Sequence, residues 1–130
     1  MRLRFDEREL QLMRAAEQVR GAALARQARP DELRDALALA RAGQKLRSAA
    51  AGPSLVFEEP EIRMLLGAVR FAHDEVQRAA SARDGPTDGP TLAVLNGFPE
   101  LVERGLWRGY ALTRELDELA QRLEAALRSM

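Results

Sequence analysis

Apolar residues recur every three or four positions along four long stretches of this chain. That spacing places them on one face of an α-helix. The pattern predicts helices over about residues 7–28, 31–49, 60–82 and 110–128. Together they would contain more than half of the chain, whereas an average domain is roughly one third helix. The pattern therefore predicts an all-α fold.

The same spacing predicts which side chains face the core. In the first helix these are Leu10, Met13, Ala16, Val19, Ala23 and Leu24, and in the second Leu33, Leu37, Ala40 and Leu46. In the third they are Ile62, Leu65, Val69, Ala72, Val76 and Ala80, and in the last Leu112, Leu116, Leu119, Leu123 and Ala126. The last set alternates spacings of four and three, which is typical of bundle packing.

The opening of the chain resembles a later segment, shifted by 52 positions. Residues 3–24 and 55–76 share eleven identical or conservative pairs in 22 positions without a gap. Each copy starts with Leu-x-Phe, an extended pattern, and continues as a helix with acids in its first turn, where they suit the helix dipole. We expect the two copies to form the same strand–helix unit, with Phe5 and Phe57 equally buried.

The repeat suggests an architecture for the whole chain. We expect one domain over residues 1–130, with halves 1–52 and 53–130 and an insert at about 84–110 in the second half. The halves would form a four-helix bundle-like domain with a pseudo-twofold axis. The extended segments could pair as a short antiparallel ribbon, within one chain or between two. Within the insert, the segment from Pro99 onward reads as the start of a further helix.

Composition removes several classes of function. The chain has no cysteine, which excludes disulfides and thiolate sites. It shows no signal-peptide pattern and no apolar run of the ~18 residues that a membrane span requires, so we expect a cytoplasmic protein. Net charge is zero, although residues 1–50 alone carry +4. The overall balance argues against strong attraction to nucleic acid.

Motifs for cofactor or metal chemistry are absent, so we expect no cofactor and no metal site. His73 is the only histidine, and it lacks the Glu-x-x-His context of helical di-iron proteins. Acids cluster at Glu58-Glu59-x-Glu61, Glu100-x-x-Glu103 and Glu115-x-x-Glu118. If such acids converged in a cleft they could hold Mg²⁺, which makes a Mg²⁺-dependent hydrolase the second alternative function.

A basic stripe on the second predicted helix suggests the first alternative. Arg34, Arg41 and Lys45 lie on roughly one side of that helix and could contact phosphate in a nucleic acid. The other interpretation is a solvated face whose charges pair with Asp31, Asp35 and neighbouring acids. No aromatic residue alternates with these charges.

The leading hypothesis is a non-enzymatic helical module that binds another protein, as a small regulator, adaptor or assembly subunit. Its candidate contact residues are Phe98, Trp107, Arg108 and Tyr110, because Trp, Tyr and Arg are enriched at binding hot spots. They lie in residues 96–110, which the first half lacks. The competing interpretation is that these rings close the open end of the bundle.

Self-association is a further expectation. Small residues at Ala36, Ala40 and Gly43 would let two helices approach closely, and small interaction modules are commonly twofold dimers. We therefore expect a homodimer.

Overall fold

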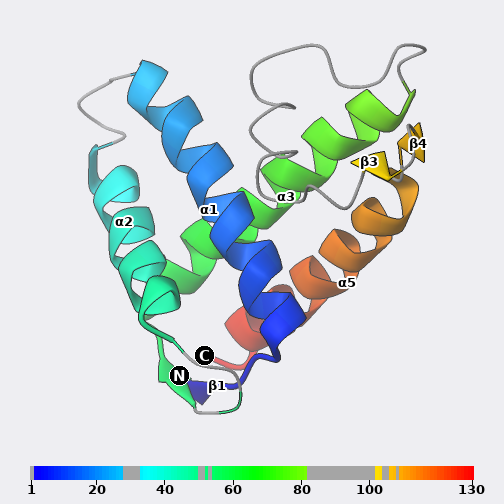
Figure 1. The fold of residues 1–130 in the computed structure, drawn as a ribbon. Coiled ribbons are helices and arrows are strands. Elements are labelled where there is room, and N and C mark those ends of the chain that lie inside the picture. The colour runs from blue at the N-terminus through cyan, green and yellow to red at the C-terminus, as the bar shows by residue number, and fades with distance from the viewer. Residues whose placement is uncertain are drawn as a thin grey trace.

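The structure is a computed structural model, which describes residues 2–27, 33–49, 52, 54–81, 102–103, 106–107 and 109–130. Side chains are described for residues 2–21, 34–49, 52, 54–78 and 111–130. Figure 1 shows the path of the chain.

Four helices dominate the described chain. They are α1 (Glu7–Gln27), α2 (Leu33–Arg47), α3 (Glu59–Ser81) and α5 (Gly109–Arg128), of 21, 15, 23 and 20 residues. Together they exceed half of the 130-residue chain, so the predicted all-α class is confirmed. Four two-residue strands accompany them: β1 (Arg2–Leu3), β2 (Leu55–Val56), β3 (Val102–Glu103) and β4 (Leu106–Trp107).

The predicted ribbon is present and forms within one chain. Strands β1 and β2 pair antiparallel, with Leu3 opposite Leu55. Such a short ribbon is marginal alone. Here Phe5 and Phe57 follow the two strands and pack edge to face, their ring centres 6.2 Å apart, and both are buried. The rings therefore anchor the ribbon to the helices.

Helix α3 is the centre of the packing. It contacts α1, α2 and α5, and α1 also packs on α2. Figure 1 shows α5 running alongside α3, while α1 and α2 lie across it. Every predicted inward residue whose side chain is described is buried in α1, α3 and α5. Leu12, Ala15, Leu66 and Ala68 are also buried, which widens the apolar faces of α1 and α3 beyond the predicted stripe.

The predicted inward face of α2 was wrong at Leu37 and Ala40, whereas Leu46 is buried as predicted. Leu37 is 58% exposed and Ala40 is exposed, whereas the helix buries Leu39, Ala42, Gly43 and Leu46. Alternation of Leu and Ala along this helix makes two faces equally apolar, so periodicity alone does not choose between them. The buried face is the one that contains Gly43, because α1 approaches closely there.

The small-residue stripe does not form one surface. Gly43 lies against α1 inside the chain, so it is not free to contact a second copy as the proposed Ala36–Gly43 stripe required. The homodimer itself stays a prediction, which light scattering tests against the monomer mass of 14.4 kDa.

The helix expected from Pro99 onward was also wrong at the residues that are described. Val102–Glu103 and Leu106–Trp107 instead pair as antiparallel strands, with Val102 opposite Trp107. β-Branched and aromatic residues favour strands, and that preference outweighed the helix-start signal of the proline.

The two halves correspond in detail. Helices α1 and α3 begin 52 positions apart, at Glu7 and Glu59. Helices α2 and α5 correspond at an offset of 77, where four buried positions coincide: Leu39, Ala42, Gly43 and Leu46 match Leu116, Leu119, Ala120 and Leu123. Each half begins with a strand and contains two of the described helices, and in the second half β3 and β4 lie between those helices. An origin in duplication stays a prediction.

Candidate functional site

The start of α1 is capped by two reciprocal hydrogen bonds. The Glu9 backbone N–H donates to Oδ1 of Asp6 at 2.7 Å, and the Asp6 N–H donates to Oε1 of Glu9 at 3.1 Å. At the start of α3, 52 positions later, the Glu58 N–H donates to Oε1 of Glu61 at 2.8 Å. In both halves a glutamate in the first turn therefore satisfies a backbone donor that the helix leaves unpaired.

A cation from the second helix of the other half completes the first cap. The Arg122 guanidinium, on α5, donates to Oε2 of Glu9 and to the carbonyl oxygen of Arg4. It also lies over the Phe5 ring, 5.0 Å from the ring centre. Its Nη1 and Nη2 atoms donate to these two different acceptors, and Oε1 of Glu9 still accepts the hydrogen bond from the Asp6 N–H.

Lys45, on α2, holds the equivalent position at the cap of α3. Its ammonium donates to Oε1 of Glu61 at 2.6 Å and to the carbonyl oxygen of Val56 at 3.1 Å. It lies 5.7 Å from the centre of the Phe57 ring. Each partner is 52 positions beyond its counterpart in the first half.

The lysine leaves one acceptor unused. Both oxygens of Glu9 accept hydrogen bonds, whereas both donors at Glu61 reach the same oxygen. Oε2 of Glu61 has no partner, although the side chain is almost fully buried. An unpaired buried acceptor costs roughly 1–3 kcal/mol. This atom is the one such side-chain oxygen or nitrogen among the described residues.

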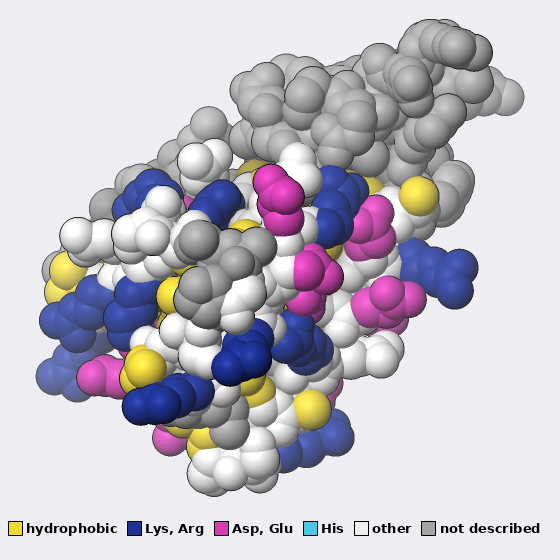
Figure 2. All heavy atoms as spheres, turned by 60° about the horizontal axis from the view of Figure 1, so that its bottom comes forward, with side chains coloured by type: hydrophobic (Ala, Val, Ile, Leu, Met, Phe, Trp, Pro, Cys, Tyr) yellow, Lys and Arg dark blue, Asp and Glu magenta, His cyan; other side chains and the backbone are white. Residues whose placement is uncertain are grey.

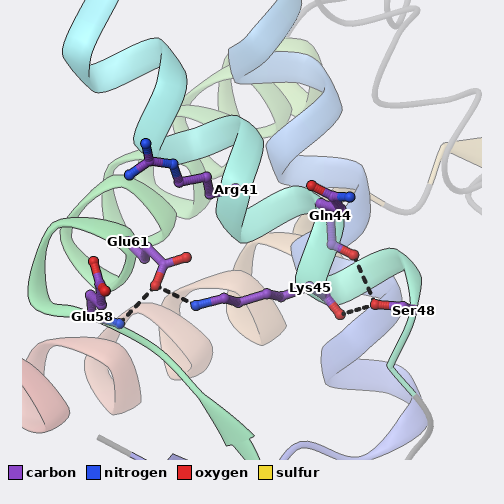
Figure 3. Close-up of a pocket in the computed structure, with 6 residues that line it drawn as sticks. All are labelled: Arg41, Gln44, Lys45, Ser48, Glu58 and Glu61. Atoms are coloured by element: carbon purple, nitrogen blue, oxygen red, sulfur yellow. Dashed lines mark hydrogen bonds and ion pairs between the residues drawn. The ribbon is translucent and has the colours of Figure 1, made fainter.

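A hollow of about 520 Å³ opens beside this glutamate, between α2 and the start of α3 (Figure 3). It is lined by Arg41, Gln44 and Lys45 from α2, by Ser48 just after that helix, and by Glu58 and Glu61. Figure 3 shows the free oxygen of Glu61 turned away from Glu58 and toward α2. Within the described part of the chain, the exposed side chains of Arg41 and Glu58 have no ion-pair partner.

A smaller hollow of about 390 Å³ lies at the corresponding place beside Glu9, between α1 and α5. An ion pair bridges it: the Arg8 guanidinium donates to both carboxylate oxygens of Glu115, at 2.6 and 3.1 Å. At the hollow beside Glu61 the corresponding positions hold Pro60 and Ala38, which cannot form the bridge. The hollow beside Glu61 therefore stays open.

Glu17 is a second buried carboxylate, on the face of α1 that meets α2. A methyl group added to Gly43 would lie 2.5 Å from its carboxylate, so the carboxylate occupies the space that the glycine leaves. Burial raises the pKa of Glu17, and Arg47, whose Nη1 is 3.4 Å from Oε2, acts in the opposite direction. The second half has Val69 and Ala120 at the two positions, an apolar contact.

The predicted phosphate-contact residues divide into two groups. Arg34 and Arg41 are exposed on α2 and have no ion-pair partner among the described residues. Lys45 is instead committed to Glu61, so it does not belong to a free basic stripe. Pairing with acids of α2, the alternative interpretation of the stripe, is absent for Asp35, the one such acid that is described.

The predicted partner-binding residues lie outside the described side chains. Trp107 belongs to β4 and Tyr110 to α5, but only their backbone is described, and Phe98 and Arg108 lie outside the described residues. Their role stays a prediction.

Most acids of the predicted clusters are paired individually. Glu59 pairs with Arg63, Glu115 with Arg8, and Glu118 with Arg114 at 3.6 Å. Glu100 and the side chain of Glu103 are outside the described set. No three acids or histidines converge on a possible metal position within the described residues.

The chain matches no protein-family model, no curated protein and no solved structure. No helix in its described part is long and apolar enough to cross a bilayer. Arguments about function therefore depend on the geometry of its own residues.

Proposed function

We propose that this chain is a non-enzymatic helical module that binds another protein through the outer face of α2. The observation that carries the proposal is the exposure of Leu37, 58%, between two exposed arginines on the same helix face. Arg34, Leu37 and Arg41 are spaced by three and four residues, which is the spacing of anchors on a helix that docks against a partner.

The same face of α5 is a useful reference. At the offset of 77, Leu37 corresponds to Arg114 and Arg41 to Glu118, and these two form an ion pair along α5. That arrangement is typical of a solvated helix face. On α2, Leu37 takes the place of the arginine and Arg41 the place of the glutamate, so this ion pair cannot form there. Figure 2 shows dark blue basic side chains gathered on the left, the side on which α2 lies in Figure 1.

Charge complementarity defines the partner. Two arginines without an ion-pair partner among the described residues flank a leucine. They fit an acidic amphipathic segment, whose apolar residue covers Leu37 and whose carboxylates pair with the guanidinium groups. Arginine is frequent at binding hot spots for this reason. The proposal includes a cytoplasmic location, which cell fractionation tests directly.

Capture from native lysate with matched variants tests the proposal. Leu37→Glu repels an acidic partner and should leave the fold intact because the position is exposed. Arg114→Glu, the same change at the corresponding position of α5, is the control. We expect Leu37→Glu to abolish capture of a protein bearing an acidic amphipathic segment, and the control to retain it. A purified fragment containing that segment should bind more weakly as salt rises.

Two outcomes contradict the proposal. One is capture that Leu37→Glu and Arg114→Glu affect equally, which would remove the α2 face from the interaction. The other is capture that nuclease abolishes, together with binding of random DNA that Arg34→Gln and Arg41→Gln weaken. That result would favour the nucleic-acid alternative.

A further inference from the structure

The hollow beside Glu61 combines three unused polar groups. The Arg41 guanidinium stands at its rim, the Glu58 carboxylate at the start of α3, and the orphaned Oε2 of Glu61 beneath them. One group attracts an anion and two attract a cation. The set is complementary to a molecule that carries both charges.

The cap of α1 has a donor for each carboxylate oxygen of its glutamate, whereas the cap of α3 lacks one. At the cap of α1, a guanidinium supplies a donor to Oε2 of Glu9, the counterpart of the unused oxygen, and an ion pair bridges the adjacent hollow. At the cap of α3 the cation is Lys45, whose ammonium donates to Oε1 of Glu61 and to the carbonyl of Val56 but not to Oε2 of Glu61. The missing component is one cationic donor that enters from the hollow.

We propose that this hollow binds a small molecule of the basic amino acid class, with its cationic end on Glu58 and Glu61 and its carboxylate on Arg41. Guanidinium and carboxylate form planar two-bond pairs, which gives both ends directional contacts. Oε2 of Glu61 has less than 1 Å² of accessible surface. Lys45, which is partly exposed, therefore shifts on binding so that the ligand and the lysine share the two oxygens.

This site is separate from the face proposed above to bind a protein. Only Arg41 belongs to both, whereas Leu37 lies outside the hollow and Glu58 outside the α2 face. Failure of one proposal therefore leaves the other standing, because Leu37→Glu and Glu58→Gln report on different surfaces.

Nuclear magnetic resonance titration of the ¹⁵N-labelled full chain provides the test. L-arginine is the probe, agmatine lacks its carboxylate, and L-citrulline lacks its side-chain charge. An N-acetylated dipeptide that ends in arginine distinguishes a free amino acid from the end of a peptide chain. We expect L-arginine to shift the amide signals of residues 44–48 and 58–61, and agmatine and citrulline to bind at least about tenfold more weakly. Binding of the dipeptide as tight as that of L-arginine would assign the same chemistry to a peptide terminus.

The sharpest variant is Lys45→Arg, which gives the cap of α3 the residue type that Arg122 supplies to the cap of α1. Its guanidinium should satisfy Oε2 of Glu61, so we expect an equal or higher melting temperature together with at least tenfold weaker binding. Glu58→Gln should also weaken binding, whereas Arg114→Gln on α5 should not. A merely structural lesion cannot explain a variant that is more stable and binds less.

Three results would overturn the proposal. One is the absence of site-specific shifts with every probe at concentrations up to tens of millimolar. Another is equal binding of L-arginine and L-citrulline, which would remove the role of charge. The third is inorganic phosphate that shifts the same amides more strongly than L-arginine, since the hollow would then be a simple anion site.

Discussion

The caps at the starts of α1 and α3, one in each half of the molecule, use equivalent residues but differ in how their glutamate carboxylates are paired. At the start of α1, Arg122 of α5 satisfies the carboxylate of Glu9, and an ion pair bridges the adjacent hollow. At the start of α3, Lys45 of α2 leaves Oε2 of Glu61 without a partner, and no further ion pair among the described residues bridges the hollow. Comparison with the fully paired carboxylate of Glu9 shows that Glu61 lacks one donor, and we place a ligand there. Comparison with the Arg114–Glu118 pair shows that Leu37 lacks a partner among the described residues, and we place a protein contact there.

The difference also separates stability from function. A fully paired surface such as α5, with its Arg114–Glu118 contact, needs no external component. A buried oxygen without a donor lowers stability when nothing is bound. The exposed Leu37 side chain gains burial only when a partner covers it. Such local conflicts are expected at binding sites more than elsewhere.

The largest expected effect tests whether Phe5 and Phe57 contribute equally to stability. Phe5→Ala and Phe57→Ala should each lower the free energy of unfolding by about 3–5 kcal/mol, because both rings are buried and pack on each other. Urea denaturation measures both. A cost below about 1 kcal/mol at one position alone would show that the two rings are not equivalent.

A second comparison concerns the two cations. Lys45→Met should cost about 3 kcal/mol, because it leaves the buried Glu61 carboxylate without its cation. Arg122→Met should cost about 1 kcal/mol, since the Glu9 side chain is more exposed and water can replace the arginine. Glu61→Gln should recover part of the Lys45→Met loss. Equal costs for the two methionine variants would contradict the difference in burial.

A residue swap between the halves addresses the α1–α2 contact. Glu17→Val with Gly43→Ala installs the pair found at Val69 and Ala120, and it should raise the free energy of unfolding by about 1–2 kcal/mol. Gly43→Ala alone should give no gain, because its methyl group would displace the Glu17 carboxylate. A double-mutant cycle measures the coupling. Additive single effects would show that the two side chains do not interact.

The smallest effect is pH-dependent and concerns Glu17 itself. Burial raises its pKa above the ordinary value of 4.5 in the folded state, so the unfolded chain releases this proton at lower pH. The carboxylate therefore lowers stability above the folded-state pKa, and this loss disappears as pH falls toward 4.5. Glu17→Gln should be more stable than the wild type by about 1 kcal/mol at pH 7. The gap should close near pH 4.5, and a constant gap across this range would refute the assignment.

Periodicity predicted the fold well wherever one helix face was clearly more apolar than the others. The alternating Leu spacing of α5 identified its buried seam, and the Leu-x-Phe openings identified the ribbon and its two anchoring rings. The prediction of the buried face of α2 failed at Leu37 and Ala40. Leu37 and Leu39 lie on different faces of that helix, and only tertiary packing at Gly43 decides which face is buried.

The candidate site was harder to predict because its important features are relationships between distant residues. Arg41 and Lys45 were singled out, but the pairing of Lys45 with Glu61 depends on how α2 meets α3. Glu17 was missed, although its repeat position is occupied by Val69, a core residue. Comparison of the copies would have marked it as a charge at a buried position. An orphaned oxygen has no signal in sequence at all.

The ribbon has a consequence for synthesis of the chain. Arg2 pairs with Val56, so β1 has no partner until more than fifty further residues have been added. At about 5–20 residues per second, translation takes roughly 3–10 seconds to supply them. During that interval Phe5 has no Phe57 to pack against, while α1 and α2 can already associate. The nascent chain therefore leaves the Phe5 ring without this contact for seconds, until β2 and Phe57 have been synthesised.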